Sequence, residues 1–519
     1  MVDINNIFSI DNQLSKQTTI TEQDKIIFKE LSTFLAPYDD FQKKAIISNS
    51  PIIKCIAGAG TGKTTILTKR VEFLVKYKGV NSEKILAITF TRKARQEMQN
   101  RLLKNGIIAN VETFNSFSEK FLQKYSHKIY GKQTKVLDYT HKQILFSLAL
   151  QSLNITRETL IEEYFKDYQK SNKSKEELTF QLIDDCFFIL DYFKSKNKRL
   201  EDFSVQTTSN NQTAKTLLMV CKQLENSLKL QGLRTYNDQL LDVIAFFTKN
   251  FLFIPKFEHI LVDEYQDVNN QQIELLELLA PKNLFIVGDP RQSIYGWRGS
   301  NINYLLDFEK KYPQYETIIL NKNYRSNKKI VDIINSLIKP FNLPDLKSIF
   351  PEEDSCFLYE FFSERDEFNF IIKKIKEYKD IFILARTNKQ LQELSVLLKN
   401  KNIPYTIKKE DDISHYSGIT LSTIHAIKGL ESETVFIIGC NEQNFPCKYS
   451  ENPVIDILKI NDYDKEQEEK RLFYVAISRA KKNLFLTYSG KRHTNFINEE
   501  MIKILNMRSN TNNHQNQNI

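Results

Sequence analysis

The sequence of 519 residues is poor in the features that mark secreted, zinc-binding and membrane proteins. Its six cysteines show no C-x-x-C spacing and no metal-type spacing to histidine, which favours free thiols in a reducing compartment. No apolar run is long enough to span a bilayer. The N-terminus has no apolar signal segment, and the first arginine is Arg70, which argues against a transit peptide. We therefore expect a soluble, intracellular protein, cytoplasmic or nuclear, with no membrane partner.

The charge balance indicates a partner only weakly. Lysine and arginine number 73 against 64 aspartates and glutamates, a net charge of +9. A basic excess suits a polyanion, although an ordinary lysine-rich surface explains it equally well. The length predicts about three domains, each large enough to bury a core.

One glycine-rich stretch, residues 57–65, organises the rest of the chain. An apolar, β-branched run precedes it and a helical pattern follows it, so we expect a strand, a turn and a helix. Glycines let backbone N–H groups point inward, and the helix N-terminus adds its dipole, which together bind phosphate. Lys63 is expected to reach the β- and γ-phosphates of ATP, and the Thr64 hydroxyl to hold Mg²⁺. The expected phosphate loop consists of Ala57, Gly58, Ala59, Gly60, Thr61, Gly62, Lys63, Thr64 and Thr65.

Two adjacent carboxylates, Asp263 and Glu264, end a second buried-strand pattern. Because strand side chains alternate in direction, the two can do different work. One can bind the Mg²⁺ held by Thr64, and the other can polarise water for attack on the γ-phosphate. A charged loop after a core strand would explain either carboxylate alone, but it fits poorly with the phosphate loop upstream.

Two aromatic residues, Tyr295 and Trp297, lie in a glycine-rich loop beside arginines. Such rings suit stacking on nucleic-acid bases. A buried aromatic anchor is the alternative that remains open for Trp297, the single tryptophan of the chain. Gln42, near the start of a helix, could read an adenine edge, and an exposed helical glutamine is its alternative.

The order and length of these motifs resemble those of superfamily 1 DNA helicases of the UvrD/Rep type. The resemblance covers nearly the whole chain, apart from a helical insertion and the tails. It implies an α/β fold of two RecA-like P-loop domains with parallel sheets. It also implies ATP and Mg²⁺ as cofactors and single-stranded or tailed duplex DNA as partners, and it names no protein partner.

The resemblance further implies a role for each matching residue. For the nucleotide site, it matches Gln42 to adenine reading, Asp263 to Mg²⁺, Glu264 to the general base, Gln292 to the γ-phosphate sensor, Tyr324 to adenine stacking, Arg325 to the γ-phosphate, Glu431 to the ribose and Arg479 to the arginine finger. For DNA, it matches Phe90, Thr113, Tyr295, Trp297 and His425. An arginine finger is worth about 10³–10⁵ in phosphoryl transfer because it meets charge developing on the γ-phosphate.

The expected organisation has two interrupted domains. A polar tail (1–23) precedes the first RecA-like domain, which comprises 24–116 and 251–320 around a mostly helical insertion (117–250). The second RecA-like domain (321–506) is followed by a disordered tail (507–519). Only a short linker, 409–417, stands where relatives carry the large 2B subdomain, and nine residues cannot form a domain.

Three smaller departures from the family pattern put single contacts in doubt. Ala57 replaces the first glycine of the strict phosphate-loop pattern, and Thr65 stands where many relatives have an arginine. Asn115 stands where a histidine is usual, so a DNA contact is altered.

The resemblance implies a motor that moves 3′ to 5′ on single-stranded DNA and unwinds duplex, in replication, repair or recombination. The missing subdomain leaves open a translocase that removes proteins without unwinding alone. A nucleotide-dependent DNA-binding scaffold is a further alternative, against which the carboxylates and arginines argue. RNA is a weaker alternative as substrate.

Overall fold

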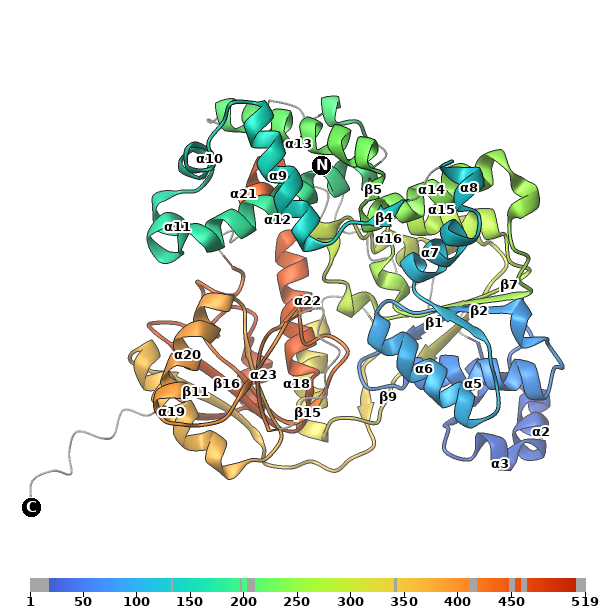
Figure 1. The fold of residues 1–519 in the computed structure, drawn as a ribbon. Helices are drawn as coiled ribbons and strands as arrows, with labels where there is room; N and C mark the ends of the chain where they lie inside the picture. The colour runs from blue at the N-terminus through green and yellow to red at the C-terminus, as the bar shows by residue number, and fades with distance from the viewer. Residues whose placement is uncertain are drawn as a thin grey trace, which may run out of the picture.

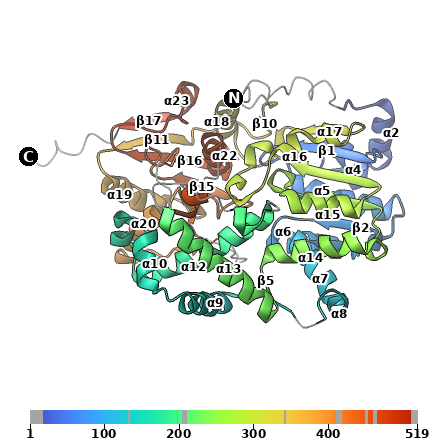
Figure 2. The same cartoon turned by 90° about the horizontal axis from the view of Figure 1, so that it is seen from above.

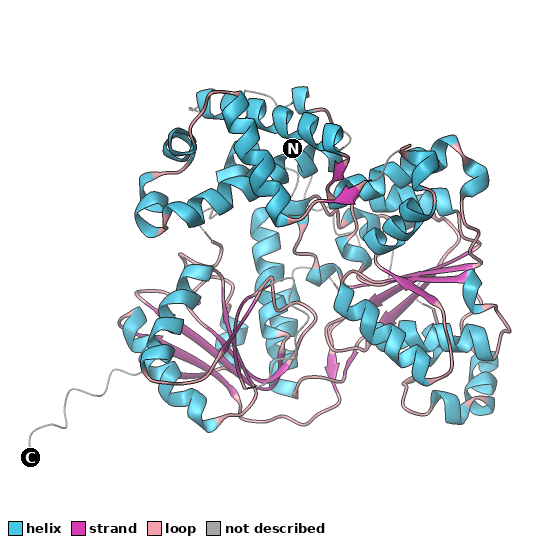
Figure 3. Cartoon of the chain, viewed as in Figure 1, coloured by secondary structure: helices cyan, strands magenta, loops and turns pink. Residues whose placement is uncertain are grey.

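The computed structural model describes residues 18–131, 134–196, 198–202, 211–339, 343–409, 418–447, 453–458 and 464–509. Two parallel sheets lie side by side, and a cluster of helices lies above the left-hand sheet in this view (Figure 1, Figure 3). This confirms the expected α/β class with two parallel-sheet domains.

The first sheet has the strand order β3-β2-β6-β7-β1-β8, and every pair in it is parallel. Its strands are β1 (Ile52–Ala57), β2 (Ile85–Ile88), β3 (Asn110–Glu112), β6 (His259–Val262), β7 (Asn283–Gly288) and β8 (Glu316–Leu320). One face packs on α4 (Asp40–Ile47), α5 (Lys63–Lys76) and α6 (Arg92–Lys104). The other packs on α7 (Phe114–Lys124), α14 (Tyr236–Lys249) and α15 (Asn270–Leu279). Ligand groups gather at the carboxyl edge of such a sheet, where the strands' loops meet.

The remaining short elements of this domain lie at its periphery or join it to the second domain. They are α2 (Glu22–Glu30), α3 (Ser32–Leu35), α8 (Ser126–Ile129), α16 (Asn303–Leu306), α17 (Phe308–Lys311), β9 (Lys322–Asn323) and β10 (Lys347–Ser348). The helical segment at the start of this domain is interrupted, because α2 ends at Glu30 and α3 begins at Ser32.

The second sheet has the order β13-β14-β12-β15-β16-β11-β17, again with every pair parallel. Its strands are β11 (Cys356–Phe361), β12 (Ile381–Ala385), β13 (Thr406–Lys408), β14 (Ile419–Thr423), β15 (Ser432–Ile437), β16 (Ala480–Ser489) and β17 (Asn506–Ser509). One face packs on α18 (Lys328–Ile338), α22 (Lys465–Ile477) and α23 (Glu499–Ile504). The other packs on α19 (Glu364–Lys374) and α20 (Asn388–Asn400).

Strand β17 corrects one expectation. The tail was expected to be disordered from residue 507, but β17 runs to Ser509 and pairs in parallel with β11. The open edge of β11 offers backbone partners that outweigh the polar composition of these residues. Residues 510–519 and the 410–417 part of the expected short linker lie outside the described residues.

The insertion is mostly helical, as expected, with its own apolar core. Its elements are β4 (Lys135–Val136), α9 (Tyr139–Ser152), α10 (Arg157–Tyr164), α11 (Asp167–Asn172), α12 (Lys175–Ser195), α13 (Asn211–Gln231) and β5 (Leu233–Arg234). That core extends from Leu137 to Leu233, whereas α7 and α14 belong to the core of the first sheet.

A short helix from the second half of the chain joins the insertion. Helix α21 (Pro453–Leu458) contacts α12, and Val454 is 1% exposed in the insertion's core. Figures 1 and 2 show the insertion beside the second domain, with β5 next to α14 of the first. The three parts of the molecule therefore share contacts.

Candidate active site and nucleic-acid interface

The phosphate loop joins β1 to α5 at the carboxyl edge of the first sheet. Gly60 and Gly62 have φ of 71° and 86°, in the region that favours glycine, so the turn requires them. Lys63 is the first residue of α5, and its Nζ donates to the Ala57 carbonyl at 3.3 Å. The loop thus has the strand, turn and helix expected of a phosphate cradle.

The Thr64 hydroxyl meets the carboxylate that ends β6. Thr64 Oγ1 donates to Asp263 Oδ2 at 2.9 Å, although the two residues are far apart in the chain. Burial and the neighbouring Glu264 charge raise the pKa of Asp263 to about 7. A buried carboxylate of this kind gains from a cation.

This pair fits Mg²⁺. Both groups offer oxygen, which Mg²⁺ prefers, and Mg²⁺ in phosphate-transfer sites takes only one or two protein ligands beside phosphates and water. Among the described residues, no group of three or more histidines, cysteines, aspartates or glutamates is placed to hold a metal ion.

Glu264 adopts a strained backbone. Its φ is 49°, a left-handed value that non-glycine residues seldom adopt, and such strain concentrates at functional sites. Gln266 Nε2 donates to its carboxylate at 2.6 Å. Although burial opposes it, the charges of Lys63 and Lys428 hold the pKa of Glu264 below its usual value. Glu264 is therefore an ionised, oriented carboxylate, as a base requires.

Gln42 and Tyr324 lie beside the loop. Gln42 is 5% exposed, so the exposed-glutamine alternative is wrong. Its Nε2 donates to the Thr61 carbonyl at 3.0 Å, and its Oε1 accepts from the Asp39 N–H at 3.0 Å. The Tyr324 hydroxyl donates to Asp39 Oδ2 at 2.7 Å. Gln42 and Tyr324, the two residues predicted to contact the adenine base, thus both bond to Asp39, the N-cap residue of α4.

Two arginines of the second domain, Arg325 and Arg479, lie on the other side of the domain boundary from the phosphate loop. Arg325 donates to Glu431 at 2.6 Å and to the Ser478 carbonyl at 2.9 Å. Arg479, at the end of α22, is 2% exposed and donates to the Val475 carbonyl at 2.9 Å and to Ser478 Oγ at 2.8 Å. Burial, and then the charge of Arg325, lower the pKa of Arg479 to about 9. Two guanidinium groups held this close favour an anion between the domains.

Asp289, Lys428 and Tyr474, to which the sequence interpretation gave no role, join the two domains together with the predicted Gln292. Tyr474 of α22 donates to Asp289 at 2.9 Å and accepts from the Ala59 N–H at 3.2 Å. Gln292 Nε2 donates to the same Asp289 carboxylate at 2.7 Å. Lys428 Nζ binds Asp267 and donates to the Gln292 carbonyl at 2.7 Å. Asp289 follows buried strand β7 as Asp263 follows β6, a pattern that could have revealed it.

Four of the five predicted DNA-contact residues form one aromatic cluster. Phe90 stacks on Tyr295 with ring centroids 5.6 Å apart. His425 lies 6.4 Å from Tyr295 and 6.3 Å, edge-on, from Trp297. Burial, and then the charges of Arg386 and Arg298, hold the pKa of His425 well below its usual value, so the ring is neutral. Tyr295 is only 7% exposed and packs in the core, whereas Phe90, Trp297 and His425 are partly exposed and could meet bases.

Trp297 is half-buried. Its ring stacks on Phe188 of the insertion at 5.8 Å, and the Arg298 guanidinium lies 4.5 Å from it. The open alternatives, base stacking and anchoring, are therefore both compatible with its surroundings.

Thr113 and Asn115 serve the local fold. The Thr113 side chain caps α7 by accepting from the Ser116 N–H. Asn115 donates to the Tyr236 carbonyl at 2.7 Å and so joins α7 to α14. The structure does not bring Thr113 into the aromatic cluster, so its DNA contact stays a prediction.

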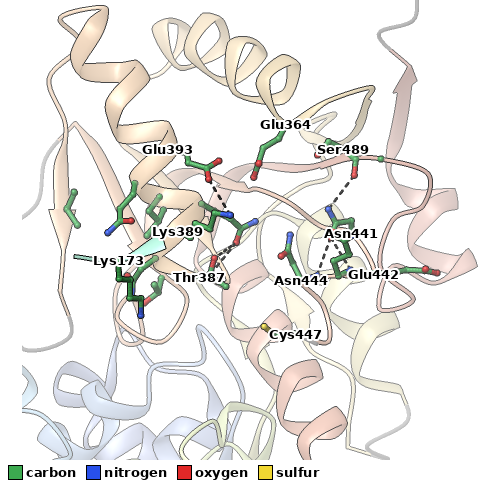
Figure 4. A pocket seen from close by; sticks show the side chains of 18 of the residues that line it. Lys173, Glu364, Thr387, Lys389, Glu393, Asn441, Glu442, Asn444, Cys447 and Ser489 are labelled. Carbon is green, nitrogen blue, oxygen red and sulfur yellow. Dashed lines mark hydrogen bonds and ion pairs between the residues drawn. The ribbon is translucent and has the colours of Figure 1, made fainter. Parts of the chain in front are cut away.

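A groove of about 1660 Å³ crosses the second domain. It brings Lys173 of the insertion together with Thr387, Lys389 and Asn441 of the second domain (Figure 4). Thr423, two residues before His425, also lines it. The lining mixes lysines and amides with four glutamates, Glu177, Glu364, Glu393 and Glu442, so its charge does not by itself favour a nucleic-acid strand. No helix in the described part of the chain is long and apolar enough to cross a membrane.

A phosphate loop with an Mg²⁺-type pair on one parallel sheet, faced by two arginines on another, defines a nucleoside triphosphatase of the two-domain RecA type. Family models agree with the geometry. The UvrD/REP helicase N-terminal domain matches residues 38–313, and the UvrD-like helicase C-terminal domain matches 318–412 and 407–491. The chain belongs to the UvrD/REP helicase family.

Similar individual proteins also carry helicase names. A probable DNA helicase of Mycoplasma pneumoniae is 31% identical over 472 residues, which cover 86% of this chain and 82% of that protein. PcrA of Staphylococcus epidermidis, named an ATP-dependent DNA helicase, is 32% identical over 391 residues, 70% of this chain and 50% of that protein. A probable DNA helicase II homologue of Mycoplasma capricolum is 32% identical over 392 residues, 71% of this chain and 51% of its own length. The chain thus spans about half the length of the latter two.

Proposed function

We propose that the protein is an ATP-dependent motor that moves 3′ to 5′ along single-stranded DNA and unwinds tailed duplex only weakly as a lone monomer. The observation that carries this proposal is the placement of the site residues at the boundary between the two domains. The phosphate loop with Asp263 and Glu264 belongs to one domain and Arg325 with Arg479 to the other, which supports coupling of nucleotide binding to the relative position of the domains.

Each site residue has a role in this proposal. The loop N–H groups and Lys63 bind phosphates, while Thr64 and Asp263 hold Mg²⁺. Mg²⁺ supplies neutralisation of phosphate charge. Glu264 orients the attacking water and takes its proton, and the two arginines meet the charge that develops on the γ-phosphate.

Helix α22 connects the aromatic cluster of Tyr295 and Trp297 to Arg479. The Arg471 guanidinium donates to the Ser293 carbonyl at 2.7 Å, and the Gly296 N–H donates to Glu468 at 3.0 Å. The loop from 292 to 298, which carries Tyr295 and Trp297, is therefore hydrogen-bonded to the helix that ends near Arg479. A shift of α22 on closure reaches the aromatic rings through direct contacts, which supports coupling of hydrolysis to movement.

The test combines ATPase and strand displacement. We expect single-stranded DNA to stimulate ATP hydrolysis, and a 3′-tailed but not a 5′-tailed substrate to be engaged productively. Unwinding by a demonstrated monomer should be weak, because the duplex contacts of the absent 2B subdomain are missing. Robust single-turnover unwinding of a long duplex would contradict that part. Removal of bound proteins without unwinding would favour the translocase alternative. DNA binding without ATP turnover would favour the scaffold alternative.

Replacing Trp297 with alanine should weaken single-strand binding about ten- to a hundredfold, since base stacking is worth about 1–3 kcal/mol. DNA-independent ATPase should be nearly unchanged, and Trp297→Phe should restore most of the binding. Because Trp297 is the only tryptophan, its emission reports this site in the wild-type protein. Emission unchanged at saturating DNA, with a lower melting temperature for the alanine variant, would instead assign the ring to anchoring on Phe188.

A further inference from the structure

An exposed apolar tip marks the outer end of the first domain. It follows α14, where a short 3₁₀ helix, η4 (Phe251–Phe253), presents two large side chains to solvent. Phe251 is 72% exposed and Leu252 is 84% exposed. Adjacent exposed apolar side chains of this size on a folded surface mark sites of interaction.

Packed aromatic side chains support the tip. The Phe253 ring lies 5.3 Å from that of Tyr125 and 5.4 Å from that of Phe246, in edge-on contact with both. Phe121 packs against Tyr125 and Phe246 from α7. A partner would therefore meet side chains presented by an ordered surface and would lose less entropy on binding.

Four exposed lysines surround the tip: Lys124, Lys128, Lys249 and Lys256. Lys128 Nζ lies 4.6 Å from the Phe253 ring centroid, and Lys124 Nζ lies 5.3 Å from that of Tyr125. None of the four forms an ion pair within the part of the chain that the structure describes. We call the tip and these lysines the η4 surface.

The two aspartates of α14 are already paired with other cations. Asp242 binds Arg234, and Asp238 binds Lys194. Glu119 of α7 accepts from the amides of Gln123 and Gln239, both at 2.8 Å, and keeps its charge, as does the exposed Glu258. With four lysines against these two carboxylates, the η4 surface keeps an excess of positive charge.

We propose that the η4 surface docks an acidic peptide segment of a partner protein, whose apolar side chain seats on Phe251 and Leu252 while its carboxylates meet the lysines. Charge complementarity selects this partner. A second copy of the chain would bring the same positive charges together. A nucleic-acid strand would find only one exposed ring beside the aliphatic Leu252, and both views place α8 and α14 away from the second domain and its groove (Figure 1, Figure 2).

The probe is a fluorescein-labelled peptide, Asp-Asp-Leu-Asp-Asp-Phe, measured by fluorescence anisotropy against the whole protein. We expect saturable binding that weakens as NaCl is raised, because exposed charges are screened. Peptides with lysine in place of aspartate, or serine in place of leucine and phenylalanine, should bind at least tenfold more weakly. Equal binding of all three peptides would overturn the proposal.

Variants locate the site. Leu252→Asp and Lys128→Glu should each weaken peptide binding about tenfold or more, as loss of a contact at an interface centre does. Ile108→Asp, which alters another exposed apolar residue (77% exposed), should bind like the wild type. All three should keep the melting temperature and the DNA-stimulated ATPase. Unchanged peptide binding by both η4 variants would refute the assignment, as would loss of oligothymidylate binding without loss of peptide binding, which would assign the surface to nucleic acid.

Discussion

Replacing Glu264 with glutamine should leave nucleotide binding intact and slow ATP hydrolysis by about 10²–10⁴-fold, the range that a positioned general base contributes. The amide keeps the shape of the side chain but cannot take a proton. The Mg²⁺ pair of Thr64 and Asp263 remains, so affinity for a fluorescent ATP analogue should stay near the wild-type value. Steady-state ATPase with saturating single-stranded DNA gives kcat.

Lys63→Ala is the matched control for this variant. It should lose turnover together with nucleotide affinity, because it removes a phosphate contact rather than the base. Adding excess chelator to the wild type should likewise abolish turnover. If Glu264→Gln hydrolysed ATP at the wild-type rate, Glu264 would not be the base, and its left-handed backbone would need another explanation.

Replacing Arg479 with alanine should lower kcat by about 10³–10⁵-fold, as expected for loss of an arginine finger. The guanidinium is buried just after the end of α22, and the positive charge of Arg325 acts on it, so a phosphate anion would be stabilised beside the two arginines. Arg479→Lys keeps one positive charge but not the planar fork, so it should recover little activity.

The measurement must separate catalysis from folding, because Arg479 also donates to the Val475 carbonyl and to Ser478. Thermal melting and DNA binding of the Arg479→Lys protein report the fold. A melting temperature lowered by several degrees, with kcat per folded molecule unchanged, would make Arg479 a structural residue of α22.

Local features of the site were predictable from sequence. The phosphate loop depends on a strand, glycines and a helix within one short stretch, and Asp263 and Glu264 depend on a strand end, so spacing alone indicated them. The Thr64–Asp263 contact followed because both groups lie at the same edge of a parallel sheet.

Contacts made between distant segments were not predictable in the same way. Tyr474 reaches Asp289 and the phosphate loop only because α22 packs across the domain boundary. Asn115 reads in the sequence as an altered DNA contact, yet it joins α7 to α14. Nothing local to Val454 indicates that it completes the core of an insertion more than 200 residues earlier in the chain.

That docking of Val454 bears on how the parts of the molecule can move relative to one another. Burying a side chain of this kind stabilises a contact by about 1.5–3 kcal/mol, so α21 resists leaving α12. The other end of α12 is held to the first domain, where Gln271 donates to the Lys194 carbonyl at 2.6 Å and Phe188 stacks on Trp297. The insertion is thus joined to the first domain through α12 and contacts α21, a segment from the second half of the chain, so a movement of the first domain would act on these two joints. The Phe188–Trp297 joint consists of two stacked rings without a hydrogen bond between them, so sliding there breaks no hydrogen bond and is the easiest of these movements.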